Sequence, residues 1–315
     1  MKTTMMHSPF RLLSRRAWQA ILLAFALFIA SGARASEIEV VTSFSILGDL
    51  ARQIGGERVS VHTLIGPGQD AHAHEPRPSD ARRIRSAGLV VQNGLGFDDW
   101  LPRLAQSSGY RGTLVVASNG IRPLVMHDEN GHAHGAHESH IDPHAWQDVA
   151  NVRIYVDNIS AALTAADPAG AETYRTNAAR YRAELDALDA DIRAAIARLP
   201  QERRRVVSSH DAFGYFARAY GLTFLAPVGA AGHSTPKARD VARLIEQLRN
   251  EKAPAVFIET IIDPRLIERI RVESGARVGG TLYSDALSPT EGPAPTYVAM
   301  MRHNLATLMA ALAGN

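Results

Sequence analysis

The hydrophobic positions of this chain fall into short runs, and segments with helical spacing separate the runs. In the first half, near-continuous stretches of Val, Ile and Leu predict four strands. These stretches are 38–43, 59–65, 89–93 and 113–118. Apolar residues at three- and four-residue steps predict helices between them, for example over 46–54 and 79–87. Runs without polar alternation are typical of parallel strands that are buried on both faces, so we expect one α/β lobe here.

The same pattern restarts in the second half of the chain. Four further apolar runs occur, at 205–208, 223–228, 254–259 and 277–282. Helical spacing falls between them over 236–250 and 264–274, and a final helix is expected over 292–313. Strands that alternate with helices predict a second α/β lobe with a parallel sheet of its own.

The segment between the two lobes is predicted to be one long helix over 168–200. Its apolar residues recur at three- and four-residue steps: Tyr174, Ala178, Tyr181, Leu185, Leu188, Ile192 and Ile196. About 30 residues at 1.5 Å each would give a rod of roughly 45 Å, long enough to reach both lobes. We therefore expect an N-terminal lobe over 36–167, a bridging helix over 168–200 and a C-terminal lobe over 201–315, with limited movement between the lobes.

The first 35 residues are expected to be a signal peptide that is removed. Basic residues precede a 13-residue apolar stretch over 18–30, which is too short to span a membrane comfortably, and Ala33-Arg34-Ala35 is a typical cleavage site. This segment holds five of the 34 basic residues and none of the 32 acidic ones, so the remainder is acidic by three charges. Interspersed charges of this kind give no reason to expect nucleic-acid binding.

The chain contains no cysteine. An exported protein without cysteine forms no disulfide and has no site for a lipid anchor, so we expect a periplasmic, monomeric protein that is not a lipoprotein. A metal site in such a chain has only nitrogen and oxygen ligands.

Four residues that suit a metal ion stand directly after predicted strands: His72, His144, His210 and Asp285. Ligands bind beyond the carboxyl ends of the strands in open parallel sheets, so all four can face one crevice between the lobes. Three imidazoles and one carboxylate make a four-coordinate set that suits Zn²⁺. Mn²⁺ is the alternative ion, because geometry and availability can override this preference.

Other polar residues near these positions have competing interpretations. His74 is the rival of His72 in the same stretch, and we expect only one of the two to bind. Asp285 is also consistent with a turn or helix cap. Glu259 ends a predicted buried strand and is either an acceptor that orients a ligand imidazole or a helix cap.

Residues 127–140 form a low-complexity insert that carries five of the 13 histidines. These are His127, His132, His134, His137 and His140. The insert has almost no apolar residue that could offset the entropy of ordering it, so we expect a mobile loop with weak auxiliary metal sites.

Several stretches resemble the solute-binding proteins of ABC transporters in the zinc and manganese group called cluster A-I. They are Gly66–His72, Pro76–Asp80, Asp142–Trp146, His210–Phe216, Tyr220–Leu222, Glu259, Leu282–Asp285 and Tyr297–Asn304. The resemblance covers essentially all of the chain after the signal peptide. It implies two Rossmann-like α/β lobes with parallel four-stranded sheets, bridged by a long rigid helix, and one metal ion held by His72, His144, His210 and Asp285. In this family a histidine at the position of His210 is typical of zinc proteins, as is a histidine-rich insert.

The expected function is high-affinity capture of Zn²⁺ in the periplasm and delivery to an inner-membrane ABC permease, with a manganese-binding protein of the same family as the alternative. A periplasmic metallochaperone is a second candidate partner. A zinc hydrolase is less consistent with the sequence, because Asp285 would close the water position and no HExxH motif occurs. A third hypothesis from the same residues is a surface adhesin or a metal-storage protein.

Overall fold

The structure is a computed structural model in which most of the chain after residue 36 is described. The described ranges are 37–126, 140–208, 210–226, 241–242, 245–246, 248–249, 255–259, 264–275 and 277–313. The predicted signal peptide and its cleavage site after Ala35 lie outside these ranges. Four histidines of the predicted loop, His127, His132, His134 and His137, also lie outside them.

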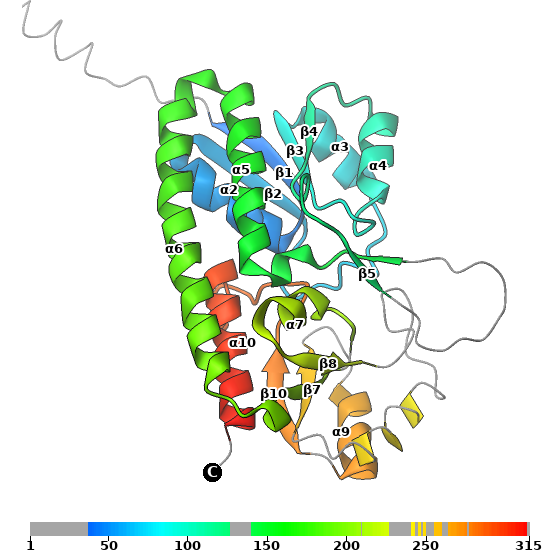
Figure 1. Ribbon diagram of the computed structural model, residues 1–315. Helices are drawn as coiled ribbons and strands as arrows, with labels where there is room; N and C mark the ends of the chain where they lie inside the picture. The colour runs from blue at the N-terminus through cyan, green and yellow to red at the C-terminus, as the bar shows by residue number, and fades with distance from the viewer. Residues whose placement is uncertain are drawn as a thin grey trace, which may run out of the picture. The chain divides into compact units, whose positions relative to one another are not determined.

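The N-terminal lobe is built on a parallel sheet with the strand order β2-β1-β3-β4 (Figure 1). Its strands are β1 (Ile38–Phe44), β2 (Val59–Ile65), β3 (Leu89–Gln92) and β4 (Thr113–Val116). In this register Val40 of β1 pairs with Val61 on one side and with Leu89 on the other. The helices are α2 (Ser45–Gly55), α3 (Pro78–Ser86) and α4 (Trp100–Ser108). The predicted strands and helices of this lobe are confirmed.

The C-terminal lobe repeats this plan with the strand order β10-β9-β7-β8. The strands are β7 (Arg205–Ser208), β8 (Thr223–Leu225), β9 (Val256–Glu259) and β10 (Val278–Leu282), and all the pairs are parallel. Helices α7 (Gly214–Tyr220) and α9 (Pro264–Ser274) belong to this lobe. The described residues of the helix predicted over 236–250 are helical, and Val241, Ile245 and Leu248 bury against Val207, Val256 and Ile270.

The predicted bridging segment contains the long helix α6 (Ala171–Ala197), which follows a short 3₁₀ turn at Pro168–Gly170. All seven residues of the predicted apolar stripe, from Tyr174 to Ile196, are buried. At 1.5 Å per residue, α6 is about 40 Å long. It packs against α2 of the first lobe and against α7 of the second, so it spans both sheets (Figure 1).

The long helix does not bridge the lobes alone. Helix α5 (Val149–Ala166), which the hydrophobic pattern did not predict, packs along α6 and contacts β3 and β4. The final helix, α10 (Tyr297–Leu312), starts later than predicted and packs against α6, β10 and α2. One continuous cluster of buried apolar side chains runs through both sheets and these helices. The bridge is therefore a packed group of helices that shares its core with both lobes.

A short antiparallel hairpin precedes the second predicted ligand. Strand β5 (Leu124–Met126) pairs with β6 (His140–Asp142), and Val125 stands opposite Ile141. His140, which we expected to lie in the loop, is instead the first residue of β6 and pairs with Met126. The hairpin ends at Asp142 and so sets where the chain enters the Asp142–His144 turn.

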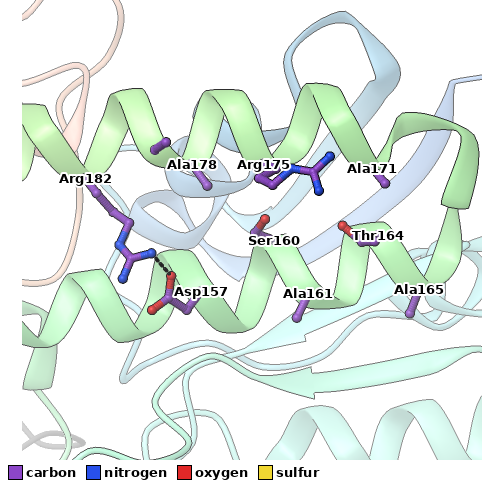
Figure 2. Close-up of a pocket in the computed structure, with 10 residues that line it drawn as sticks. Asp157, Ser160, Ala161, Thr164, Ala165, Ala171, Arg175, Ala178 and Arg182 are labelled. Atoms are coloured by element: carbon purple, nitrogen blue, oxygen red, sulfur yellow. Dashed lines mark ion pairs between the residues drawn. The ribbon is translucent and has the colours of Figure 1, made fainter.

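Helices α5 and α6 border a groove of about 570 Å³ on their outer side (Figure 2). Small residues form most of its lining, including Ala161, Ala165 and Ala171. Arg182 forms an ion pair of 2.9 Å with Asp157 across it. The groove contains no imidazole, so it is distinct from the metal site predicted from the sequence. No helix in the described part of the chain is long and apolar enough to cross a membrane.

Helix α2 lies so close to β2 that Gly48 leaves no room for a side chain. A methyl group at Gly48 would overlap Oγ1 of Thr63, a hydroxyl that accepts a hydrogen bond of 3.2 Å from Thr42. We expect Gly48→Ala to lower the free energy of unfolding by about 1–3 kcal/mol, because Thr63 must move and break this bond. Urea denaturation of the metal-free protein measures the change.

Gly66→Ala is the matched control, because a methyl group there meets nothing closer than 3.8 Å and the backbone is not left-handed. Equal losses of stability in Gly48→Ala and Gly66→Ala would contradict the close approach of α2 and β2.

Candidate metal centre

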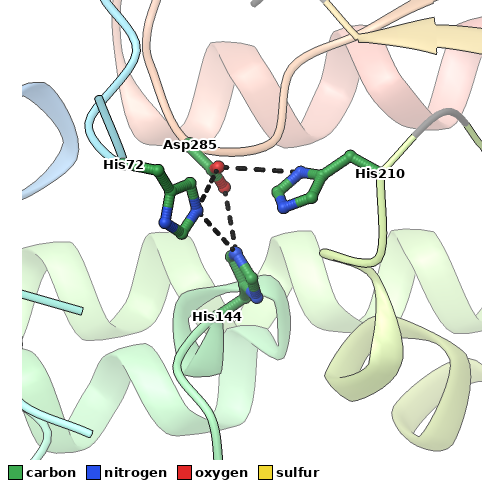
Figure 3. Close-up of side chains that lie close together, drawn as sticks. All are labelled: His72, His144, His210 and Asp285. Carbon is green, nitrogen blue, oxygen red and sulfur yellow. Dashed lines mark hydrogen bonds and ion pairs between the residues drawn. The ribbon is translucent and has the colours of Figure 1, made fainter. Parts of the chain in front are cut away.

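The four residues predicted as ligands lie together between the two lobes (Figure 3). His72 follows β2, His144 follows β6, His210 follows β7 and Asp285 follows β10. One candidate ligand atom from each residue lies within 4.8 Å of those of the other three. His144 and Asp285 are 1% exposed and His210 is 4% exposed. Segments that are more than 200 residues apart in the chain therefore meet at a single buried point.

Three of the gaps, those among His72, His144 and Asp285, suit an ion of zinc size. Nε2 of His72 lies 3.4 Å from Nε2 of His144 and 3.1 Å from Oδ2 of Asp285. Nε2 of His144 lies 3.5 Å from Oδ1 of Asp285. Two nitrogens bound tetrahedrally to zinc at 2.0–2.1 Å would be about 3.4 Å apart. The three gaps fall close to that separation.

In two of the three histidines, a carboxylate contacts Nδ1 of the imidazole. Nδ1 of His144 lies 2.7 Å from Oδ1 of Asp142, and Nδ1 of His210 lies 3.0 Å from Oε2 of Glu259. A proton on each Nδ1 that is donated to the carboxylate leaves Nε2 as the atom available to a metal. Glu259 also accepts a hydrogen bond of 2.9 Å from the backbone N–H of His210. The orienting contact predicted for Glu259 is therefore present in the structure.

The same local turn delivers the two histidines of the N-terminal lobe. The backbone N–H of His72 donates to Oδ1 of Asp70 at 2.8 Å, and that of His144 donates to Oδ1 of Asp142 at 2.9 Å. An aspartate that caps its own backbone two residues later favours such turns. Asp70 is exposed, whereas Asp142 is buried and also contacts the imidazole.

Three atoms at the centre accept no well-formed hydrogen bond. They are Nε2 of His210 and the two carboxylate oxygens of Asp285. Only ion-pair distances to the imidazoles relieve the carboxylate, and a buried anion without donors is costly. A cation that binds all three atoms would remove that cost, so the donor set fits a metal ion.

Neighbouring charges shift the pKa values of two candidate ligands, His210 and Asp285, in opposite directions. Burial alone would lower the pKa of His210, but the charges of Glu259 and Asp285 outweigh burial and raise this pKa to about 9. Burial alone would raise the pKa of Asp285, but His144, His210 and His72 hold it well below its usual range. The metal-free site is therefore expected to carry an imidazolium next to a carboxylate at neutral pH.

The structure places His74 away from this cluster. Its ring packs on Trp100, with ring centroids 4.8 Å apart, and Nε2 lies 3.7 Å from Oδ2 of Asp80. His72 and His74 thus point to different places. The alternation of an extended strand does not explain this, because residues two apart would then share a face; residues 71–73 instead form a bend and turn. Of the predicted loop histidines, only His140 lies in the described part of the chain, in the backbone of β6.

The sequence did not predict two supports of the site. One is the contact of Asp142 with the His144 imidazole, for which the repeated Asp-x-His spacing at Asp70 and Asp142 is a signal. Behind His144, Trp146 Nε1 and Gln147 Nε2 both donate to the Ser284 carbonyl oxygen, at 2.8 and 2.9 Å. These bonds hold the backbone before Asp285 against the turn that carries His144. Trp146 also packs on the His144 ring, with ring centroids 5.3 Å apart.

Comparisons with known proteins show the family to which the chain belongs. Residues 40–311 match the family described as zinc-uptake complex component A, periplasmic. The chain is 34% identical over 313 residues to the iron-binding protein YfeA of Yersinia pestis, a match that covers 96% of this chain and 97% of that protein. It is also 34% identical over 275 residues to the manganese-binding lipoprotein MntA of Halalkalibacterium halodurans, covering 87% of this chain and 88% of that protein.

Among solved structures, the periplasmic zinc-binding protein TroA of Treponema pallidum is similar with a TM-score of 0.79 and 30% identity. The match covers 88% of this chain and 99% of that chain. These three relatives are named for three different metals, so family membership establishes that the solute is a metal ion but does not choose the metal. The zinc hydrolase considered above is excluded, since the family consists of binding components of transporters. The chain therefore belongs to the family of metal-binding solute-binding proteins of ABC transporters, which are not enzymes.

Proposed function

We propose that the protein binds Zn²⁺ in the periplasm through His72, His144, His210 and Asp285 and delivers the ion to an inner-membrane ABC permease. The observation that carries this choice is the set of three imidazoles gathered around one carboxylate, with 3.4 Å between Nε2 of His72 and Nε2 of His144. A nitrogen-rich set favours Zn²⁺ over the harder Mn²⁺. The match to a family described by zinc uptake supports the same choice.

Manganese is the second candidate, and one feature of the site favours it. Both oxygens of Asp285 face imidazoles: Oδ2 lies 3.1 Å from His72 Nε2, and Oδ1 lies 3.5 Å from His144 Nε2. Bidentate binding by this carboxylate would give five protein ligand atoms, a number that suits metals with higher coordination numbers than tetrahedral zinc. The metal titration below separates the two candidates.

The proposed ion has to enter and leave a site whose ligands are almost fully buried. His72 is the most accessible ligand, with 9% of its side chain exposed, whereas the Asp285 side chain is fully covered. Metal entry and release therefore require a local opening, and contact with the permease is the proposed trigger for release. The orienting carboxylates Asp142 and Glu259 keep the imidazoles in the tautomer that binds the ion.

The remaining parts of this proposal concern the segments around the site. Residues 1–35 act as an export signal that is cleaved after Ala35, and the mature protein acts as a monomer without a lipid anchor. The lobes comprise 36–167 and 201–315, with the bridging segment over 168–200. The loop histidines between 127 and 140 bind further Zn²⁺ weakly, and a periplasmic metallochaperone is a candidate partner for loading.

The purified protein should bind one Zn²⁺ tightly and Mn²⁺ about 100-fold or more weakly, because three imidazole nitrogens favour zinc. His72→Ala should abolish the tight phase, and His74→Ala is the matched control that should leave it intact. Competition with a chelator of known affinity measures both ions. Tighter binding of Mn²⁺ would establish the manganese alternative, and an unchanged tight phase in His72→Ala would mean that the site is elsewhere.

Zinc binding should release a proton from His210 at neutral pH, because the metal must displace the proton that a pKa of about 9 retains. The apparent affinity for Zn²⁺ should rise about tenfold per pH unit between pH 7 and about 9 and then level off. Calorimetry in buffers with different ionisation enthalpies counts the protons released. An affinity that stays constant from pH 7 to 9 would contradict a protonated His210.

The stability of the metal-free protein should fall over the pH range in which the affinity for Zn²⁺ rises. A raised pKa in the folded state gives a stabilisation that is complete below the ordinary value of 6.5 and is lost as the pH rises through about 9. The increase in melting temperature that Zn²⁺ causes should therefore be larger at pH 9 than at pH 6.5.

Glu259→Gln should weaken zinc binding by about 10–100-fold, because the variant loses the carboxylate that fixes the His210 tautomer. The pKa of His210 in the metal-free variant should also fall, since the charge of Glu259 raises this pKa more than any other neighbouring charge does. NMR titration follows the imidazole, and chelator competition follows the metal. Glu202→Gln, at an exposed position, is the control for a lost carboxylate. If Glu259→Gln behaves like Glu202→Gln, Glu259 does not orient His210.

A further inference from the structure

The loop that joins β3 to α4 has an unusual backbone and contacts two of the candidate ligands. Three consecutive residues are left-handed: Gly94 with φ 82°, Leu95 with φ 56° and Gly96 with φ 86°. Leu95 is the only non-glycine residue with positive φ in the described part of the chain. A conformation of this kind persists where the surroundings fix it, and it is common where a functional group must be held in place.

Buried hydrogen bonds fix the start of this loop. The carboxylate of Asp98 accepts the backbone N–H of Asn93 at 2.7 Å and that of Gly94 at 2.9 Å. Ser118, beyond β4, donates to the Asn93 carbonyl at 2.6 Å. A side chain at Gly94 would overlap Val116, so the backbone lies directly against β4. The loop is therefore held from within and by the neighbouring strand.

The side chain of Asn93 connects this loop to the turn that carries His144. Its Nδ2 donates to the carbonyl oxygen of Pro143 at 3.1 Å, one residue before His144. Its Oδ1 accepts a hydrogen bond of 2.6 Å from the hydroxyl of Tyr155 on α5. A single amide thus links the end of β3, the helix behind the sheet and the approach to a candidate ligand.

The far end of the loop places Phe97 against both imidazoles of the N-terminal lobe. The Phe97 ring meets His72 edge-on, with centroids 5.0 Å apart, and His144 edge-on at 6.1 Å. Trp146 and Phe44 pack on its other sides, each at 4.9 Å, and Phe97 is only 6% exposed. Edge-to-face packing restricts the tilt of each ring. His72 and His144 are therefore confined by the same buried aromatic side chain.

We propose that the Asn93–Asp98 loop is a fixed frame that sets the separation of His72 and His144 before metal binds, with Phe97 as the positioning residue for both. Phe97 does not bind the metal itself. It removes the freedom of two imidazoles that would otherwise have to be ordered by the ion, and ligands held in advance bind more tightly and more selectively. This inference rests on metal binding at the proposed site but not on which metal binds.

Two pairs of variants test the frame. Phe97→Leu removes the ring, and its matched control is Phe216→Leu, a buried phenylalanine on α7 whose ring neighbours are Phe213, Tyr220 and Phe224. Gly96→Ala strains the loop at φ 86°, and its control is Gly109→Ala at φ 78°. A methyl group meets nothing within 4 Å at either glycine, so the pair compares strain in the Asn93–Asp98 loop with strain at the C-cap of α4.

Three properties are measured for the wild type and the four variants. They are the zinc and manganese affinities by chelator competition, the urea midpoint of the metal-free protein and the visible spectrum of the Co²⁺ form. We expect Phe97→Leu and Gly96→Ala to lose at least about tenfold in affinity and to alter the Co²⁺ spectrum. The two controls should lower the urea midpoint to a similar extent, with affinities within about threefold of wild type and an unchanged spectrum.

Affinity losses that are equal within each pair, or absent in both test variants, would overturn the frame. In that outcome wild-type protein still binds metal, so the proposed function stands. If wild-type protein binds neither Zn²⁺ nor Mn²⁺ tightly, the proposed function fails and the frame fails with it. Should Phe97→Leu not fold, the Gly96→Ala and Gly109→Ala pair alone decides the outcome.

Discussion

A buried carboxylate that faces three imidazoles is the constraint around which the two lobes are arranged. Asp285 is 1% exposed, and neither of its oxygens accepts a well-formed hydrogen bond. An anion in such a place is tolerated only when positive charge comes close to it. A protonated His210, whose pKa is raised to about 9, would supply that charge in the metal-free protein, and a bound ion would supply it instead. The same carboxylate therefore links the proposed cation binding to pH.

The fold holds this carboxylate by bonds that cross between the lobes. Trp146 and Gln147 both donate to the carbonyl of Ser284, so the backbone before Asp285 is attached to the turn that follows His144. The hydroxyl of Tyr297 on α10 donates to the carbonyl of Trp146 at 2.7 Å. The bridging helices and the metal centre are thus parts of one hydrogen-bonded structure, which explains why so many large side chains around them are fully buried.

The parts of this structure that the sequence predicts are those that depend on simple periodicity. Strands buried on both faces appear as continuous apolar runs, and the stripe from Tyr174 to Ile196 predicts α6 because only one face of that helix is buried. Helix α5 could have been predicted in the same way, because its buried residues also recur at three- and four-residue steps: Val149, Val152, Val156, Ile159 and Leu163. Its β-branched residues, such as Val152 and Ile159, favour strands and weaken the helical signal.

The candidate ligands were predictable because each follows a strand, and parallel strands bring their carboxyl ends to one edge. Their supports were harder to find. Asn93 and Phe97 lie in a segment with the composition of an ordinary glycine-rich loop. The left-handed backbone at Leu95 has no sequence signature. The contact of Asp142 with the imidazole two residues later could not be predicted, since it depends on the side-chain conformations of both residues.

The origin of the ligands in four distant segments has a consequence for folding. An ion bound at the proposed site would join residues 72 and 285, and a bond across so long a stretch of chain removes much of the freedom of the unfolded protein. In a chain without cysteine, that ion would act as a reversible cross-link, comparable to a disulfide. A protein loaded with its metal is the cross-linked form, and handing over the ion returns the chain to the state in which its segments are joined only by the packing of the lobes.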